Sequence, residues 1–449
     1  MNPLLLPPSL TAVAVLTLVA VVILALAGRL ADSPRTVMAL GLLGAILAAL
    51  PAVAARATDL PAVLGVAALA ALALLLLPGL EVEDGGQRPE VAALLLLGSA
   101  GAIVLATAGD LLSLALGLET LSLAVAVVTA LGRGARPLEA AFKYFVLAAV
   151  SLAALVYGIG LYVLATGSLS LAAPAPADPG LQFLYAAGVV LVALGFGFEL
   201  AVAPLHWGAL DAYIAAPPGA AGYIMSASKL GAVLALSRLA VAVGAPVGAV
   251  LIGVGVLSIG WGTIGALAQR DLRGLLGYSA IAHAGFLALA LGSGPDGRVA
   301  AVFYVVVYAA TASLVFATLA GQGTGPLPLD ALSSTRLGPL RGIALSLGLL
   351  SLAGIPPTPG FWAKLVILGP AWTVAGPGPT IIAVIGGVAG ALYYLRPLPD
   401  LFATVRAGAQ PATGPLAGLA VALAGAAVIL FGLVPGLAYV LASLSQVGA

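Results

Sequence analysis

Five ionisable residues lie inside apolar segments of this sequence, where only lipid or neighbouring helices are expected. They are three lysines and two glutamates: Glu119, Lys143, Glu199, Lys229 and Lys364. A lone charge at the centre of a bilayer costs from about 3 to well over 10 kcal/mol, so such residues are functional candidates by default. Acids and bases in a low-dielectric interior can stay ionised as pairs, and moving one partner changes the proton affinity of the other. The pattern indicates proton or cation translocation.

The lysines are unusual because the chain has so few of them. Lys143, Lys229 and Lys364 are the three lysines among 17 basic residues, and the rest are arginines that mostly occupy short polar breaks. A desolvated lysine can release its proton, whereas an arginine effectively cannot. Lysines retained inside apolar segments are therefore candidates for proton carriers.

Each of the five residues also has a purely structural explanation. Lys143 can reach the membrane interface from near a helix end, and Glu119 can form a structural ion pair. Glu199 and Lys364 lie beside predicted helix breaks and can satisfy freed backbone groups there. Lys229 lies about ten residues into its helix, so a structural role explains it least well.

His206 and His283 are the chain's two histidines, and both lie near the ends of apolar runs. An imidazole titrates near neutrality, so each is a candidate proton relay, although a hydrogen-bonded structural histidine explains either equally well. The chain has no cysteine, which excludes disulfides, thiolate metal sites and cysteine-ligated clusters. We expect no metal and no cofactor in this chain. Its net charge of +1 gives no reason to expect nucleic acid as a partner.

The elements that position these residues are predicted to be membrane-spanning helices. The 449 residues are 62% hydrophobic and 7% charged, against about 25% charged residues in soluble domains. A span needs about 20 apolar residues. Fourteen segments qualify, the N-terminal one being read as a span rather than a removable signal, and no soluble domain fits between them. They are 9–28, 36–54, 60–80, 91–108, 110–131, 138–166, 181–203, 219–242, 246–268, 273–293, 299–320, 342–374, 380–395 and 412–444.

Two of the segments are predicted to be interrupted. Proline and glycine break the stretches 201–219 and 352–364, and proline in a span frees carbonyl groups. Irregular backbone at membrane depth is tolerated where protein buries it or where it lines a watery cavity. Interrupted helices at corresponding places in two halves favour an inverted-repeat transporter.

The arginines predict the orientation of the chain. With both termini outside the cytoplasm, most arginine-containing breaks fall on the cytoplasmic side, as the positive-inside rule requires. The acidic loop 81–90 falls on that side as well, but acidic residues weigh little in the rule. The cytoplasmic arginines are then Arg29, Arg35, Arg133, Arg136, Arg270, Arg273, Arg336, Arg341, Arg396 and Arg406.

Several motifs together resemble a known family. They are GDLLSLALGLETLSLAV (109–125), AAFKYFVLAAVSLAALVYGIGLYVLATGS (140–168), GFELAVAPLHWGALDAYIAAPPGAAGYIMSASKLGA (197–232), AQRDLRGLLGYSAIAHAGFL (268–287) and LSLAGIPPTPGFWAKLVIL (350–368). The sequence resembles the antiporter-like membrane subunits of respiratory complex I, the proton-pumping NADH:quinone oxidoreductase, and especially the subunit N (chain 2) type. The resemblance covers about residues 90–400.

The resemblance implies an all-α fold of about fourteen transmembrane helices with two inverted five-helix repeats, each containing a broken helix. We expect N-terminal helices in 1–90, repeats in 91–268 and 269–396, and a C-terminal helix in 397–449. The implied setting is a bacterial inner membrane among other membrane-arm subunits, which would handle quinone and NADH.

By motif, Glu119 matches the glutamate that pairs with a lysine in the family, and Lys143 matches the lysine of the KYF motif. Lys229 matches the central proton carrier, and Lys364 matches the lysine after the second break. Glu199 departs from the pattern, because family members usually have lysine there. Two nearby carboxylates tend to share a proton, so we expect Glu119 and Glu199 to do so, with Lys143 supplying a positive charge.

Three alternatives remain open at this point. The chain fits an Mrp-type cation/proton antiporter subunit, a scaffold subunit with weakened pumping that uses buried ion pairs for assembly, or a small-solute transporter.

Overall fold

The computed structural model describes residues 7–55, 58–80, 87–243, 245–334, 337, 339–404 and 414–444. These residues form helices joined by short connections, with two isolated antiparallel bridges. The helices are α1 (Pro8–Ala25), α2 (Ala27–Leu30), α3 (Pro34–Ala55), α4 (Leu60–Leu75), α5 (Arg88–Thr107), α6 (Leu111–Ala130), α7 (Ala135–Thr166), α8 (Pro179–Leu200), α9 (Trp207–Ala215), α10 (Pro218–Tyr223), α11 (Lys229–Val243), α12 (Ala245–Ala268), α13 (Leu272–Gly292), α14 (Gly294–Thr318), α15 (Pro339–Ala353), α16 (Pro359–Pro370), α17 (Pro377–Leu395), α18 (Leu398–Thr404), α19 (Pro415–Leu433) and α20 (Pro435–Leu444). Short 3₁₀ turns occupy η1 (Leu77–Gly79) and η4 (Leu329–Ser334), and π-helical turns occupy η3 (Ile224–Ser228) and η5 (Ala371–Ala375).

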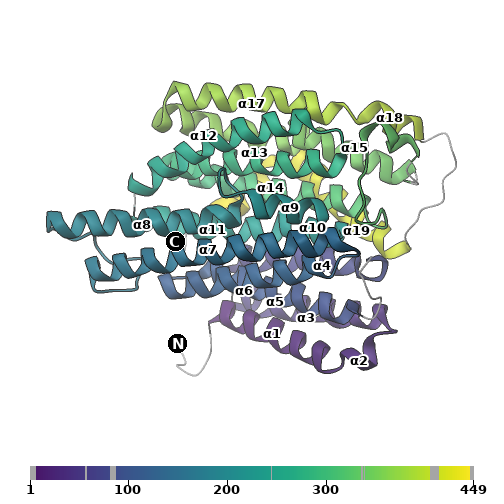
Figure 1. The fold of residues 1–449 in the computed structure, drawn as a ribbon, viewed down its shortest axis with the longest axis horizontal. Coiled ribbons are helices and arrows are strands. Elements are labelled where there is room, and N and C mark those ends of the chain that lie inside the picture. Colours follow the sequence, from purple (N-terminus) through teal and green to yellow (C-terminus); the bar gives the residue numbers. More distant parts are fainter. Residues whose placement is uncertain are drawn as a thin grey trace.

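The predicted all-α membrane fold is confirmed. Within the described residues, 13 helical segments are long and apolar enough to cross a membrane. The interrupted pair α15–α16 accounts for the remaining predicted span. The long helices run side by side, with α1 and α3 at one edge of the molecule and α17 at the opposite edge (Figure 1).

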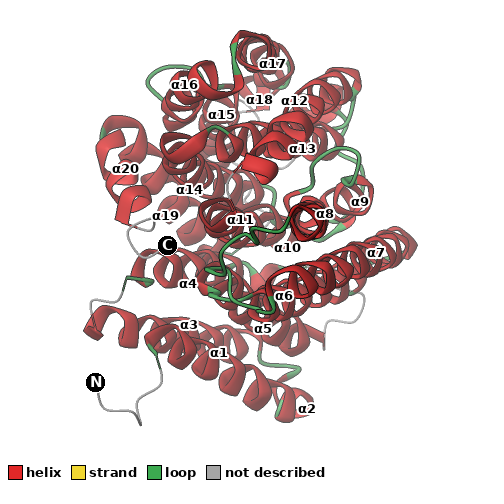
Figure 2. Cartoon of the chain, turned by 90° about the vertical axis from the view of Figure 1, so that its left-hand side faces the viewer, coloured by secondary structure: helices red, strands yellow, loops and turns green. Residues whose placement is uncertain are grey.

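Burial separates central helices from peripheral ones. Almost every residue of α13 and α14 is buried, and so is most of the continuous segment from α10 to α11. By contrast, most residues of α1, α7 and α17 are not buried. These helices lie at the periphery of the bundle (Figure 2), as expected for helices that face lipid or a neighbouring subunit. The candidate lysine Lys229 therefore belongs to the centre of the bundle.

Both predicted breaks occur, and they share a backbone geometry. Helix α8 ends at Leu200, and Ala201 then adopts left-handed backbone angles (φ 63°) before α9 begins at Trp207. Helix α15 ends at Ala353, where Gly354 is left-handed (φ 81°), and α16 begins at Pro359. A left-handed residue is a common helix terminator. The chain thus stops one helix and starts another twice.

One predicted span is wrong in detail. The segment 412–444 was expected to be a single helix, but Val434 ends α19 and Pro435 begins α20. Proline lacks the backbone N–H of a helix interior and fits the first helical turn, so it starts a new helix here.

A hydrogen-bonded tie between loops occurs twice. Before α6, Leu111 N–H donates to the Leu169 carbonyl (2.9 Å) and Leu171 N–H to Gly109 (3.3 Å). Before α13, Leu272 N–H donates to Leu327 (2.8 Å) and Leu329 N–H to Arg270 (2.9 Å). Asp110 and Asp271 each begin the following helix by accepting a hydrogen bond from its first-turn backbone. Between the start of α6 and the start of α13 the chain crosses the bundle five times. The two ties therefore lie at opposite ends of the bundle. The repeat limits 91–268 and 269–396 stay a prediction.

The loops on one face are linked through arginines. The Thr324 hydroxyl donates to the Arg133 carbonyl (3.0 Å), the Arg273 guanidinium donates to Ala216 (3.2 Å), and the Arg396 guanidinium donates to Leu267 (3.0 Å). The first contact joins the α6–α7 and α14–α15 connections. The second joins the α9–α10 connection to the start of α13, and the third joins the α17–α18 connection to the end of α12. We call this surface the arginine-rich face.

Candidate functional site

Glu199 is the centre of a buried polar cluster. It is the penultimate residue of α8 and is 2% exposed. Its Oε2 accepts hydrogen bonds from the Ser122 hydroxyl of α6 (2.9 Å) and the Tyr144 hydroxyl of α7 (3.2 Å). The Ser228 hydroxyl donates to its Oε1. Four segments therefore converge on one carboxylate, as burial of such a group requires.

Lys229 lies directly beside this cluster and is fully buried. Its Nζ donates to the carbonyl of Leu200 (2.6 Å), the group left without a helical partner where α8 ends. The ammonium also lies 5.5 Å from the centre of the Tyr213 ring, within cation–π range. Lys229 and Glu199 are close enough to interact electrostatically. The π-helical turn η3 immediately precedes Lys229, and such turns often occur at functional sites.

Lys364 forms the same kind of contact at the second break, but from α16, the helix that directly follows that break. Its Nζ donates to the carbonyls of Leu352 (3.0 Å) and Ala353 (2.8 Å), at the end of α15. It also lies 5.9 Å from the centre of the Phe286 ring. Helix ends carry partial negative charge on their free carbonyls, so both lysines are held by the same kind of group.

His283 lies between the two breaks. It is 5% exposed, with its Nδ1 2.7 Å from the Tyr304 hydroxyl and its Nε2 3.1 Å from the Tyr394 hydroxyl. Both Lys229 and Lys364 are within electrostatic reach of the imidazole. A buried imidazole with hydroxyl partners on both nitrogens can receive a proton on one side and release one on the other. This geometry fits a relay between the lysines.

Glu119 is placed at the edge of the cluster. It lies on α6, one turn before Ser122, and is partly exposed. It is within electrostatic reach of Glu199. Proton sharing between the two carboxylates stays a prediction.

Lys143 lies elsewhere. Its ammonium forms ion pairs with Glu139 (2.7 Å) and Asp211 (3.1 Å), and its side chain is 49% exposed. These residues line a recess of about 300 Å³ at the start of α7. The expected positive charge beside the two glutamates comes from Lys229 instead, because Lys143 is turned about the helix axis away from them.

His206 is buried in the first break. Its ring stacks on Trp207 (5.0 Å between centroids) and lies near Trp261 (5.9 Å). Both ring nitrogens lack a hydrogen-bond partner among the described residues. Its relay role stays a prediction.

Four partners in these clusters were not singled out from the sequence: Ser122, Tyr144, Tyr304 and Tyr394. Ser122 has a recognisable signal, since it lies three residues after Glu119 and so on the same helix face. Tyr144 follows Lys143 directly, and the helical turn between neighbours directs one outward and the other inward. Tyr304 and Tyr394 give no distinguishing signal in the sequence. The described residues contain no cluster of three or more histidine, cysteine or carboxylate side chains suited to a metal.

These features define a class: a polytopic membrane protein in which buried acids and bases line two interrupted helices, as in proton- and cation-translocating subunits. Residues 108–392 match the family model described as NADH:quinone oxidoreductase/Mrp antiporter, transmembrane. The chain belongs to this family, which confirms the resemblance seen in the sequence.

Individual relatives narrow the placement. NADH-quinone oxidoreductase subunit 14 of Thermus thermophilus is 37% identical over 78% of this chain and 79% of its own length. Subunit N of Cereibacter sphaeroides is 38% identical over 73% of each chain. A chain in the structure of Thermus thermophilus respiratory complex I with bound aureothin superposes with a TM-score of 0.82 at 33% identity, covering 95% of this chain and 98% of its own. A chain of the Mrp complex from Dietzia shares the fold (TM-score 0.79, 97% of each chain) at 19% identity.

Proposed function

We propose that this chain is a proton-translocating, subunit N–type membrane subunit of a bacterial NADH-quinone oxidoreductase. The carrying observation is Lys229, a fully buried ammonium beside Glu199 on a carbonyl released by a helix break. The sequence relatives at 37–38% identity support the complex I assignment over the Mrp alternative, because the chain of the Mrp complex is 19% identical.

The proposed proton path follows the buried groups in order. Lys229 holds a proton with Glu199 as its counter-charge and releases it when that balance changes. His283 accepts it through its hydroxyl partners and passes it towards Lys364. Glu119 on α6 and Lys143 on α7 exchange protons at the end of the path nearest these two helices. His206 is a further relay. Every step moves a proton between side chains of this chain.

The chain is proposed to carry no redox centre and no cofactor. NADH and quinone then bind to other subunits. The redox reaction in those subunits drives proton transfer here through a conformational change or a change in charge at the subunit interface. The partly exposed Glu119 supports contact with a neighbouring membrane-arm subunit, because ionisable groups within membrane helices need partners.

The orientation follows from the arginine-rich face. Its loops are tied together on one side of the bundle, and arginine-rich loops favour the cytoplasm. We therefore place this face in the cytoplasm, with both termini on the opposite side.

The test replaces Lys229 with methionine or alanine in the assembled complex and measures protons pumped per quinone reduced. We expect a lower pumping ratio in both variants, because neither side chain carries a proton. Leu239→Met, a volume-conserving change at a buried position of the same helix, is the control and should pump normally. An unchanged ratio in Lys229→Met refutes the carrier role. Loss of assembly with unaltered coupling in the complexes that remain favours the scaffold function.

A further inference from the structure

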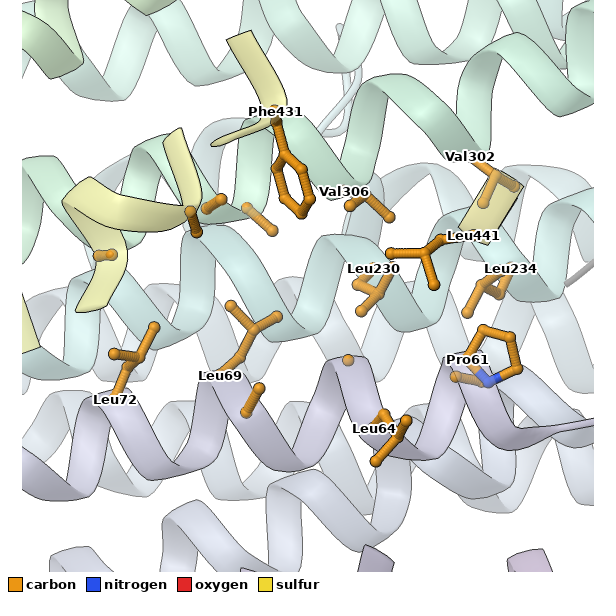
Figure 3. Close-up of a pocket in the computed structure, with 17 residues that line it drawn as sticks. Pro61, Leu64, Leu69, Leu72, Leu230, Leu234, Val302, Val306, Phe431 and Leu441 are labelled. Atoms are coloured by element: carbon orange, nitrogen blue, oxygen red, sulfur yellow. The ribbon is translucent and has the colours of Figure 1, made fainter. Parts of the chain in front are cut away.

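An apolar groove that the proposed proton path does not use opens beside α4. Its volume is about 310 Å³, and α4, α11, α14, α19 and α20 line it. All its lining side chains are apolar, among them Pro61, Leu64, Leu72, Leu234 and Phe431, as Figure 3 shows. Leu64 is 39% exposed, so the groove is open laterally at α4. A groove of this kind between membrane-spanning helices is filled by apolar chains.

One end of the groove carries a charged pair. Leu230, Leu234 and Arg238 are spaced at four-residue intervals and share one face of α11, so the groove lining leads to the guanidinium. Arg238 Nη2 donates to Asp59 Oδ1 (3.1 Å), and Asp59 comes two residues before Pro61. The two side chains are 17% and 24% exposed. Figure 3 shows Pro61 and Leu234 at this end and Leu72 at the other.

The length of the groove matches one leaflet. Eleven helical steps separate Pro61 from Leu72, which is about 16 Å at 1.5 Å per residue. The hydrocarbon core of a bilayer is about 30 Å thick, so one leaflet contributes about 15 Å. Asp59 precedes the first turn of α4 and Arg238 lies near the end of α11, so the pair lies at headgroup level.

We propose that this groove binds one acyl chain of a phospholipid whose headgroup carries both a phosphate and a primary ammonium, as in phosphatidylethanolamine. A guanidinium has five N–H donors, so Arg238 can bind the phosphate while it keeps Asp59. The Asp59 carboxylate accepts from the ammonium. An anionic headgroup without an amine would place a second negative charge beside Asp59 and leave it uncompensated.

The first test measures lipid retention by the full chain purified in mild detergent from membranes of phosphatidylethanolamine and phosphatidylglycerol. Native mass spectrometry should find phosphatidylethanolamine bound to the wild type. Ala68→Trp places an indole in the groove from an exposed position of α4. This variant should retain one phosphatidylethanolamine molecule fewer than the wild type. Ala14→Trp, at an exposed position of α1 outside the groove, is the matched control and should retain the wild-type number. Equal retention by Ala68→Trp overturns the proposal and leaves a neighbouring protein helix as the occupant.

The second test uses the wild-type chain and needs no substitution. Phosphatidylethanolamine with a diazirine in its acyl chain should crosslink to peptides of α4 and α11 on illumination. Crosslinks spread evenly over all exposed helices overturn the site.

The headgroup assignment is tested by Asp59→Asn. This variant should still bind one lipid but lose the preference for phosphatidylethanolamine over phosphatidylglycerol, whereas Ala14→Trp keeps it. An unchanged preference in Asp59→Asn overturns the role of the charged pair.

Discussion

The two helix breaks share a backbone geometry but differ in the groups that surround the lysine at each break. At each break a helix ends in a left-handed residue, and a lysine Nζ donates to the carbonyls left free. At each, the second residue of the following helix is a glycine, Gly208 or Gly360, against the backbone of a neighbouring helix.

The first break adds a carboxylate and the second does not. Glu199 lies within electrostatic range of Lys229 and accepts hydrogen bonds from three hydroxyls. In the described part of the chain neither lysine forms a salt bridge. Lys229 has Glu199 within electrostatic range, whereas carbonyl dipoles and an aromatic ring surround Lys364. The same kind of helix break can therefore stabilise a lysine with a nearby carboxylate, or with carbonyl dipoles alone. Only the first arrangement leaves a buried charge behind when its partner is removed.

Glu199→Ala is the largest expected perturbation. It leaves Lys229 without its counter-charge and three hydroxyls without their acceptor, which should lower the free energy of unfolding by about 3–5 kcal/mol. The measurement is unfolding of the chain reconstituted in lipid. Glu139→Ala, an exposed carboxylate on α7, is the control and should change little. Equal effects of the two variants would show that the first break is not charge-compensated.

Gly360→Ala should come next. A Cβ at this position would lie 1.7 Å from the Ser351 carbonyl oxygen, so α16 must move away from α15. We expect a loss of about 3 kcal/mol from this overpacking. Gly369→Ala in the same helix meets no atom within 4 Å and should gain up to about 1 kcal/mol from helix propensity. Similar unfolding curves for both variants would contradict close packing at the second break.

Lys364→Ala should cost less than Glu199→Ala. It removes the donor for two carbonyls but leaves no buried charge, so we expect a loss of about 1–3 kcal/mol. The ratio of the two effects, measured under the same lipid conditions, tests the comparison directly. A loss from Lys364→Ala equal to that from Glu199→Ala would indicate a counter-charge for Lys364.

Gly354→Ala should cost less than these three changes. A left-handed conformation costs an L-residue about 1–2 kcal/mol, and the new Cβ would lie 3.0 Å from Lys364 Cδ, the end of a side chain that can adjust. Ala201→Gly at the first break should change the free energy of unfolding by less than about 1 kcal/mol. Glycine removes the strain of the left-handed conformation, but the unfolded chain gains conformational entropy, and the two effects oppose each other. Thermal unfolding of Gly354→Ala and Ala201→Gly measures the difference in stability between the two variants.

The sequence was a good guide to helices and breaks but not to the direction of side chains. Proline, glycine and apolar length determine where α8 and α15 stop, and these signals are local. Whether Lys143 or Tyr144 faces Glu199 depends on the rotation of α7 against its neighbours, which no local pattern specifies. The tyrosines around His283 come from α14 and α17, and only tertiary packing brings them together. The Val434 interruption was missed because the apolar run continues through it.

The two loop ties restrict the way in which this bundle can rearrange. Sliding α6 along its own axis would break the hydrogen bonds of Leu111 and Leu171, and sliding α13 would break those of Leu272 and Leu329. The helices that carry Ser122 and His283 are therefore anchored against piston-like motion, one at each surface of the membrane. Tilting and sideways displacement in the membrane plane remain open to them, and that is the direction in which a neighbouring subunit would push.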